Sequence, residues 1–224
     1  MGKRCFIVGA GEGYPIRLHV NNEDMVIAVD GGFRYIKTQK IEPHILIGDF
    51  DSLGYDPQEK EKFSSDTKIL KYPSEKDDTD MELAIAEGLR AGYEQFYLLG
   101  GQGGRVDHTF ANIQSMRRLA ESGKKVVLYG MDFHMTVIAN DTFKLQKNLF
   151  EEQSEAPLVS VFALSDQAEH VTIKGAKYEV EDVTLSADTP LGVSNCYCDE
   201  EIQITVGKGT LLILWQGHLP QDLK

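Results

Sequence analysis

The sequence predicts a protein of two parts: a layered α/β nucleotide-binding type of domain with a mostly parallel sheet, followed by a small all-β sandwich or barrel. In roughly the first 140 residues, short apolar runs alternate with segments of helical periodicity, as in parallel sheets with crossover helices. After about Asn140, short runs rich in β-branched residues follow one another between turns, without a helical period. We therefore expect domains over residues 1–140 and 141–224.

Six apolar runs of the first part are expected to be strands. Most of them end in Gly, Asp or Pro, which break a strand and favour turns. Runs of this length and composition suit strands that are buried on both faces. They cover residues 5–10, 25–32, 44–50, 68–73, 96–104 and 125–130.

Two segments between these runs are expected to be helices, residues 78–93 and 107–125. Gly92 and Gly123 are placed to end them, because glycine readily adopts the left-handed conformation found after a helix. The apolar positions that repeat at helical spacing are Met81, Ala84, Ile85 and Leu89 in the first segment, and Phe110, Ile113 and Ala120 in the second.

The second part contains six further strand-like runs separated by turn residues. The polar stretch 146–157 before them is expected to be a loop near the junction of the domains. The runs cover residues 158–164, 168–175, 177–186, 193–199, 201–207 and 210–217.

Composition and charge exclude several classes of function. The 23 Lys and Arg against 35 Asp and Glu give a formal charge of −12, which argues against nucleic-acid binding. Runs of about 18 apolar residues and a signal peptide are both absent from the sequence, so no membrane association is expected. Three cysteines without a secretion signal favour a reduced, cytoplasmic setting. Cys196 and Cys198 are expected to pack as small apolar side chains of a strand rather than to bind a metal.

Four polar clusters directly follow apolar runs of the first part, where open α/β sheets bind their ligands. If the strands are parallel, all four clusters meet at one edge of the sheet. The glycines of residues 9–15 also follow a strand, with a ligand contact and a tight turn as alternatives. The four clusters are residues 30–32, 48–52, 74–80 and 100–108.

Two pairs of aspartates stand in these clusters. Asp49 and Asp51 are two residues apart, so an extended chain would aim both at one point; a solvated turn or a helix cap is the alternative. Asp77 and Asp80 are three apart at an expected helix start and would share a face. A helix N-terminus stabilises each charge by only about 0.3–1 kcal/mol. Mg²⁺ binds carboxylate oxygens together with substrate phosphates, so we expect magnesium here, with Asp78 in an outer shell or solvent.

A glycine-rich loop, residues 100–104, lies between an expected strand and an expected helix. Glycines let backbone N–H groups approach an anion, and the helix N-terminus favours negative charge. Arg105 adds a planar cation suited to phosphate. A flexible loop is the alternative for the glycines alone, but Asp107, His108 and Asn112 nearby favour a phosphate site. The pattern is neither a Walker A loop nor a Rossmann fingerprint.

The motifs AVDGG, IGDFDS, KDDTDMELA and LGGQGGRVDHTFAN, in this order and spacing, resemble the thiamine pyrophosphokinase family over nearly the whole chain. Members of that family transfer a pyrophosphoryl group from ATP to the hydroxyethyl group of thiamine, which gives thiamine diphosphate and AMP. The resemblance implies an α/β domain followed by a β-sandwich, in a homodimer with active sites between subunits. It also implies ATP, thiamine and Mg²⁺ as ligands.

The resemblance assigns residues by their place in these motifs. It implies that the magnesium and triphosphate cluster is Asp49, Asp51, Asp77 and Asp80. It implies that the ATP segment is Gly100, Gly101, Arg105, Asp107 and His108, with Asp30 as a further acid of the nucleotide site. In the second part it implies that Ser194, Asn195 and Trp215 bind thiamine, the tryptophan by stacking on its rings; a core or edge aromatic is the alternative for Trp215.

The expected reaction is attack of the alcohol oxygen of thiamine on the β-phosphorus of ATP, which depends on positioning and charge neutralisation. Asp51 or Asp80 would accept the alcohol proton, and Arg105 would hold phosphate charge. His108 is expected either to bind phosphate or to cap the helix. The alternatives are another metal-dependent transferase or phosphohydrolase, which would give other products, and a non-catalytic sensor, which would bind without turnover.

Overall fold

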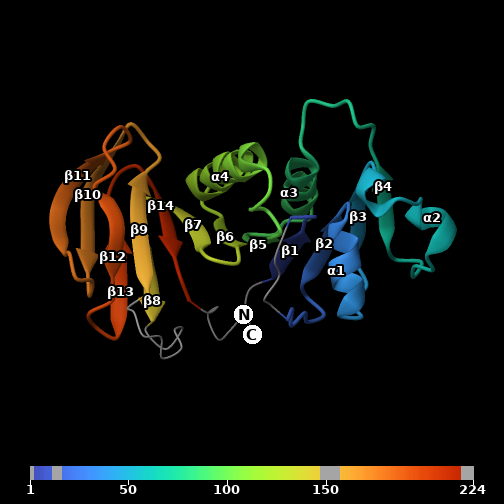
Figure 1. Cartoon of the computed structure of the whole chain (residues 1–224), viewed down its shortest axis with the longest axis horizontal. Helices are drawn as coiled ribbons and strands as arrows, with labels where there is room; N and C mark the ends of the chain where they lie inside the picture. Colours follow the sequence, from blue (N-terminus) through green and yellow to red (C-terminus); the bar gives the residue numbers. More distant parts are fainter. Residues whose placement is uncertain (1–2, 12–16, 147–156, 218–224) are drawn as a thin grey trace. The chain divides into compact units, whose positions relative to one another are not determined.

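The structure, a computed structural model, describes residues 3–11, 17–146 and 157–217 of the chain. Its contacts divide the chain into two compact units (Figure 1). The first comprises residues 1–115 and 128–131, and the second comprises residues 116–127 and 132–224. The expected loop at residues 147–156 lies outside the described residues.

The first unit is built on a parallel sheet in which the strand order is β5-β1-β2-β3-β4. The central strand β1 is buried along its length, so its apolar run packs on both sides of the sheet. Val8 pairs with Ala28 on one side and with Leu99 on the other, which aligns the carboxyl ends of three strands. The strands are β1 (Arg4–Val8), β2 (Met25–Val29), β3 (Ile45–Gly48), β4 (Lys68–Lys71) and β5 (Gln95–Leu99).

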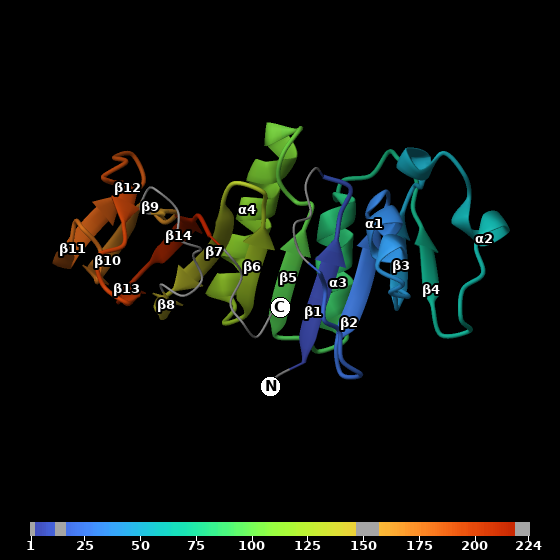
Figure 2. The same cartoon turned by 60° about the horizontal axis from the view of Figure 1, so that its bottom comes forward.

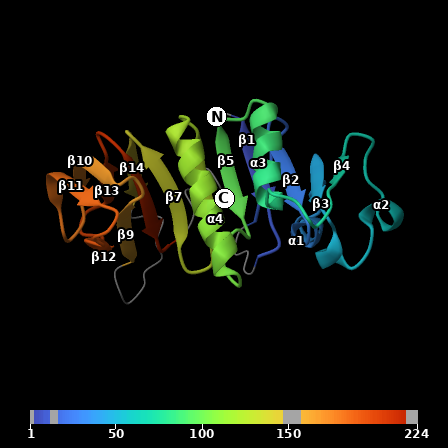
Figure 3. The same cartoon turned by 90° about the horizontal axis from the view of Figure 1, so that it is seen from above.

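Helices cover both faces of this parallel sheet. Helix α1 (Gly32–Thr38) and helix α3 (Asp80–Arg90) lie on opposite faces (Figures 2 and 3). The remaining helices are the one-turn α2 (Pro57–Lys60), the 3₁₀ helix η1 (Asp51–Leu53) and α4 (Val106–Glu121). None of the helices in the described part of the chain is long and apolar enough to span a membrane.

Both expected helices are present, and glycines with positive φ follow them, Gly92 at 80° and Gly123 at 77°. Two expected core positions are wrong. Leu89 is 37% exposed and Phe110 is 62% exposed. The buried face of α4 instead includes polar side chains, which a count of apolar residues does not detect. The buried residues of α4 are Asn112, Ser115, Met116, Leu119 and Ala120.

The second unit is a β-sandwich, which confirms the expected fold class. Strands β12-β9-β14-β7 pair antiparallel in this order within a larger mixed sheet, and β11-β10-β13-β8 form a separate four-stranded antiparallel sheet. Seventeen buried residues from the two sheets, with Trp215 among them, form one core. The strands are β7 (His134–Ala139), β8 (Thr142–Gln146), β9 (Leu158–Ala163), β10 (Gln167–Lys174), β11 (Val180–Ser186), β12 (Gly192–Cys196), β13 (Glu201–Thr205) and β14 (Thr210–Trp215).

The sequence reading identified all these strands except β7 and β8, which join through a turn where Asn140 has a φ of 51°. Strand β6 (Lys125–Tyr129) was expected; its last two residues belong to the first unit and the rest to the second.

The cysteine expectation is partly wrong. All three cysteines are free thiols, and Cys5 is buried. Cys198 is exposed, because the side chains buried in this stretch are those of the alternate residues Asn195 and Tyr197.

Candidate active site

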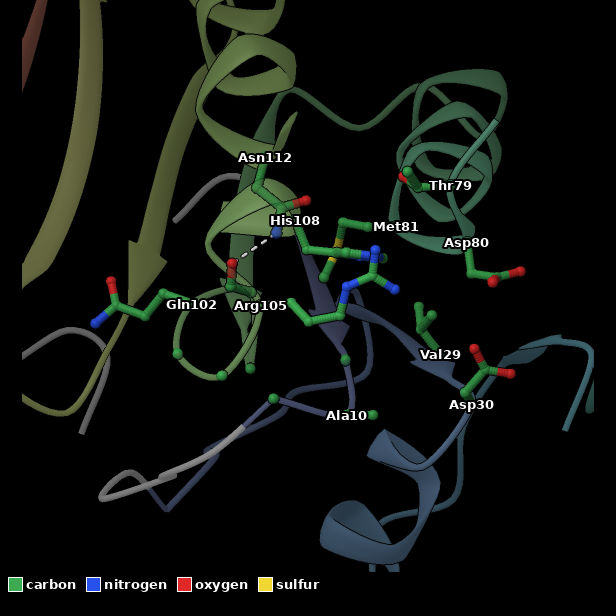
Figure 4. Close-up of a pocket in the computed structure, with 16 residues that line it drawn as sticks. Ala10, Val29, Asp30, Thr79, Asp80, Met81, Gln102, Arg105, His108 and Asn112 are labelled. Atoms are coloured by element: carbon green, nitrogen blue, oxygen red, sulfur yellow. Dashed lines mark hydrogen bonds between the residues drawn. The ribbon is translucent and has the colours of Figure 1, made fainter. Parts of the chain in front are cut away.

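A pocket with a volume of about 360 Å³ opens in the first unit beyond the carboxyl ends of β1, β2 and β5 (Figure 4). The N-terminal turns of α3 and α4 complete its wall. This is the position where open α/β sheets bind their ligands, as the sequence predicted. The lining residues are 9–11, 29–30, 79–81, 100–105, His108 and Asn112.

The glycine segments after β1 and β5 lie directly against each other. The Gly9 N–H donates to the Leu99 carbonyl at 2.8 Å, and the Gly11 N–H donates to the Gly100 carbonyl at 3.0 Å. A Cβ at Gly11 would lie 2.4 Å from the Gly100 oxygen, so this approach requires glycine. The glycines of residues 9–11 therefore form part of the pocket, which the sequence left open.

Asn112 fixes the glycine-rich loop onto helix α4. Its buried amide donates to the Gly101 carbonyl at 2.6 Å, drawn as a dashed line in Figure 4. A hydrogen bond between buried groups holds a loop more firmly than a hydrogen bond that is exposed to water. Gly100 follows β5 with a φ of 62°, so the loop turns back towards the pocket at once.

Asp30 stands at the end of β2 in a left-handed conformation, with a φ of 46°. Its N–H donates to the Ile47 carbonyl at 2.9 Å, and its carboxylate accepts from the Phe50 N–H at 3.2 Å. The neighbouring Gly48 makes room for this carboxylate, because a Cβ there would lie 1.7 Å from Asp30 Oδ1. Asp30 is therefore built into the sheet edge by residues of β3.

The surroundings raise the pKa of Asp30 to about 6. Burial is the largest cause, and the charges of Asp80 and Asp49 add to it. The Phe50 N–H and the Lys76 ammonium act in the opposite direction. Negative charge is therefore concentrated at this side of the pocket.

Lys76 is the cation that the structure places among these acids. Its Nζ lies 2.6 Å from Asp80 Oδ1 and 3.2 Å from the Pro73 carbonyl oxygen. The Lys76 and Asp80 side chains are only 14% and 22% exposed, so the pair is largely shielded from water. Asp80 begins helix α3, which the Thr79 hydroxyl caps by accepting from the Glu82 N–H at 3.2 Å.

Asp49 and Asp51 are not arranged as the sequence predicted. Phe50 has a φ of 68° and Asp51 begins the 3₁₀ helix, so the segment is a turn rather than an extended chain. The Asp49 carboxylate accepts from the Asp51 N–H at 3.0 Å, and this bond is the largest of the causes that lower its pKa. Asp51 is exposed, and neither residue lines the pocket.

The expected helical pairing of Asp77 with Asp80 is also wrong, because α3 begins at Asp80 and Asp77 precedes it. Asp77 and Asp78 are both exposed. Within the described ranges, no three His, Cys, Asp or Glu side chains are placed so that they could hold a metal ion by themselves. The assignment of Asp49, Asp51, Asp77 and Asp80 to a metal stays a prediction.

The residues expected to contact ATP phosphates are partly in place. Arg105 and His108 reach into the pocket from the glycine-loop side towards Asp80 and Asp30 (Figure 4). Asp107 is exposed, and its carboxylate accepts from Arg105 Nε at 3.1 Å. This hydrogen bond lowers the pKa of Asp107 to about 2, and Asp107 itself lies outside the pocket lining.

The expected thiamine residues lie in the second unit. The Asn195 amide is buried and exchanges hydrogen bonds with Tyr178, accepting from its N–H at 2.9 Å and donating to its carbonyl at 2.8 Å. Ser194 is exposed with a φ of 59°. Asn195 also lines an apolar hollow of about 210 Å³.

Trp215 is fully buried in the core of the second unit. Its ring contacts Phe143 at 5.3 Å and His134 at 5.5 Å between ring centroids. No hydrogen-bond partner of its indole N–H lies among the described residues. Stacking on thiamine stays a prediction, and it would require residues around this ring to move.

Several pocket residues escaped the sequence reading. Thr79 and Met81 flank Asp80 at the start of α3, and Gln102 stands within the glycine loop. A Cβ at Gly130 would lie 1.4 Å from Gln102 Nε2, so glycine at 130 gives this side chain its space. Thr79 and Gln102 lie within the polar clusters 74–80 and 100–108 that the sequence identified, although neither was assigned a role; a single sequence carries no signal for Met81.

A glycine-lined pocket with acids and an arginine at the carboxyl edge of a parallel sheet is typical of α/β proteins that bind phosphorylated ligands. Comparison with known protein families shows which family of this class the chain belongs to. The chain belongs to the thiamin pyrophosphokinase family: the model of its catalytic domain matches residues 16–128, and the model of its vitamin B1 binding domain matches residues 147–211. The chain is accordingly an enzyme that transfers pyrophosphate from ATP to thiamine and forms thiamine diphosphate.

Similar proteins agree with this assignment. The thiamine pyrophosphokinase of Bacillus subtilis is 24% identical over 197 residues, which are 88% of this chain and 89% of the relative. Thiamin pyrophosphokinase 1 of Caenorhabditis elegans is 26% identical over 178 residues, which are 75% of this chain and 70% of the relative.

Solved structures show the same fold. The crystal structure of the Bacillus subtilis thiamine pyrophosphokinase matches with a TM-score of 0.77 and 21% identity, over 96% of this chain and 100% of the other. The thiamin pyrophosphokinase from Candida albicans matches with a TM-score of 0.73 and 15% identity, over 96% of this chain and 89% of the other.

Proposed function

We propose that the pocket of the first unit is the ATP site and that it works with Mg²⁺. The observation that carries this proposal is the arrangement across the pocket, where Asp30 and Asp80 face the glycine loop and Arg105 (Figure 4). The glycine loop and Arg105 suit the phosphate oxygens. The acids would repel the same phosphates unless a cation lies between them.

The acidic side of the pocket fits magnesium. Its donors are carboxylate oxygens, the ligands that Mg²⁺ prefers, and the charges of Asp80 and Asp49 add to burial in raising the pKa of Asp30. Mg²⁺ shares one or two carboxylates with substrate phosphates, which agrees with the lack of a complete protein cage in the described residues. Asp80 and Asp49 would hold it, with Asp51 and Asp77 drawn in from the exposed turns beside them. When bound, it neutralises charge on the triphosphate.

The residues of the chain position the reactants. The glycine N–H groups and Arg105 bind phosphate oxygens, His108 adds a donor at the start of α4, and Asp107 orients the arginine. The alcohol oxygen of thiamine attacks the β-phosphorus, its proton passes to a carboxylate, and AMP leaves. Asp80 is better placed than Asp51 to accept this proton, because Asp80 lines the pocket.

We assign ATP binding and catalysis to residues 1–140 and thiamine binding to residues 141–224. Ser194, Asn195 and Trp215 are the thiamine residues of this assignment. The two groups of residues belong to different units of the chain, so we propose a homodimer in which subunits meet at the active sites. The three free thiols support a reducing, cytoplasmic setting.

Replacement of one pocket acid tests the site. We expect Asp80→Asn to lower turnover by about 100-fold or more, because a preorganised charge in the site is lost. The measurement is AMP formation from ATP and thiamine with Mg²⁺. Asp78→Asn is the matched control, because Asp78 is exposed and lies outside the pocket lining. An Asp80→Asn enzyme that keeps most of its turnover would contradict the assignment.

A further inference from the structure

Lys76 is the first residue of the motif KDDTDMELA, in which the sequence assigned roles only to the aspartates. Lys76 lies in the segment between β4 and α3 and reaches Asp80 Oδ1 at 2.6 Å. Its ammonium also donates to the Pro73 carbonyl at 3.2 Å and lies 5.8 Å from the centre of the Tyr72 ring. Lysine is a compact charge on a flexible stem, so this ammonium can leave Asp80 without a backbone change.

The charge of Lys76 acts on the whole acidic side of the pocket. It pairs directly with Asp80, and it acts more weakly on two further carboxylates: it opposes the burial that raises the pKa of Asp30, and it adds to the Asp51 N–H bond that lowers the pKa of Asp49. We call Asp30, Asp49 and Asp80 the acid cluster. Three carboxylates and one ammonium leave a formal charge of −2, which one divalent cation would neutralise.

An ammonium and a magnesium ion cannot occupy the same carboxylate oxygen. The Lys76–Asp80 pair is mostly shielded from water, so it is held more firmly than an exposed surface pair. A divalent cation that binds at Asp80 therefore competes with the Lys76 ammonium for the negative charge of this carboxylate, and this competition reduces the affinity for the metal.

We propose that Lys76 is an internal counterion of the acid cluster, which occupies Asp80 in the free enzyme and gives it up when the metal binds. Lys76 is thus a positioning residue: it keeps the aspartates close together in the absence of ligand and sets the metal concentration at which the site fills. The inference rests on the proposed magnesium site.

The test measures metal binding without turnover. Mn²⁺ is titrated into the enzyme in the absence of nucleotide and thiamine, and free Mn²⁺ is followed by electron paramagnetic resonance. We expect Lys76→Met to bind Mn²⁺ about tenfold more tightly than the wild type, because the competing charge is gone. Lys76→Gln, which keeps a polar side chain, should show the same gain, and Lys76→Arg should retain weak binding like the wild type.

The control is Lys68→Met, because Lys68 also pairs with a carboxylate of helix α3, Glu87 at 3.3 Å, but acts outside the acid cluster. Its Mn²⁺ affinity should equal that of the wild type. In an Asp80→Asn background, Lys76→Met should add little, because the oxygen for which lysine and metal compete is then neutralised.

The outcomes separate this inference from the proposed function. If the wild type binds Mn²⁺ and both neutral Lys76 variants bind it equally well or more weakly, the counterion proposal is overturned and the metal site still stands. Absence of Mn²⁺ binding, with or without ATP, in the wild type and in both neutral Lys76 variants would overturn the metal site and the counterion proposal together.

Discussion

At the scale of single residues, the charged form of Asp30 destabilises the folded protein. Its pKa is raised from 3.8 to about 6, so the folded protein disfavours its charged form. The resulting penalty is absent well below pH 4, where the carboxyl is protonated in both folded and unfolded chains; it grows between about pH 4 and pH 6 and is fully present above pH 6.

Asp30→Asn should therefore stabilise the protein at neutral and higher pH. We expect the free energy of unfolding at pH 8 to rise by about 1–2 kcal/mol, a value reduced for the partial exposure of the side chain. The amide oxygen can still accept from the Phe50 N–H. Urea denaturation without metal or nucleotide measures the effect at pH 8 and pH 4. An equal gain in the free energy of unfolding at pH 8 and pH 4, or a loss at pH 8, would show that the charge of Asp30 does not destabilise the folded protein.

Trp215 illustrates what a single sequence leaves undecided. A lone tryptophan in an apolar strand is compatible with a ligand platform and with a core position, and the structure places it in the core. Its replacement by alanine would remove core packing worth about 3–5 kcal/mol, so loss of thiamine binding in that variant would be uninformative. Phenylalanine at this position preserves most of the packing and is the better probe of stacking.

At the scale of elements, the strand ends and helix starts could be predicted because they depend on local chemistry. Apolar runs ending in Gly or Asp became β1, β2, β3 and β5, and the residues that follow β1, β2 and β5 line the pocket. The prediction of the buried helix faces was wrong where polar side chains are buried. The buried side of α4 carries Asn112 and Ser115, bonded to Gly101 and Glu82, and Phe110 faces away from it.

The predicted geometry of the two aspartate pairs was wrong for a related reason. Their expected geometry assumed an extended chain at Asp49 and a helix already formed at Asp77, whereas a left-handed Phe50 and the Thr79 cap set other conformations. Such turn conformations depend on contacts with distant residues, as at Gly48 and Asp30. Composition predicts that acids gather at this edge, but not which of them enter the pocket.

The Thr79 cap connects the stability of α3 to the position of Asp80. Thr79→Ala removes the acceptor for the Glu82 N–H, so we expect a loss of about 1 kcal/mol in stability. The first turn of α3 also carries Asp80, so the KM for ATP should rise by several-fold. Denaturation and steady-state kinetics measure both. Thr79→Ser keeps the hydroxyl and should restore both values; an unchanged KM in Thr79→Ala would mean that the cap does not position the acid.

At the scale of the whole molecule, the residues proposed to bind ATP and those proposed to bind thiamine lie in different units. The first unit contains the pocket with its acids, glycines and arginine, and the second contains Ser194, Asn195 and Trp215. The family models match the two parts separately, as a catalytic domain and a vitamin B1 binding domain. The change of periodicity along the chain predicts one domain for each part, and the boundary at residue 140 stays a prediction.

The measurement that tests the account most directly is a crystal structure with Mg²⁺ and an ATP analogue that cannot be cleaved between its α- and β-phosphates. We expect the triphosphate in the pocket of the first unit, against residues 100–105, with a metal about 2.1 Å from an oxygen of Asp80 and Lys76 withdrawn from that carboxylate. A triphosphate bound away from the glycine loop, or a metal that contacts none of Asp49, Asp51, Asp77 and Asp80, would contradict it.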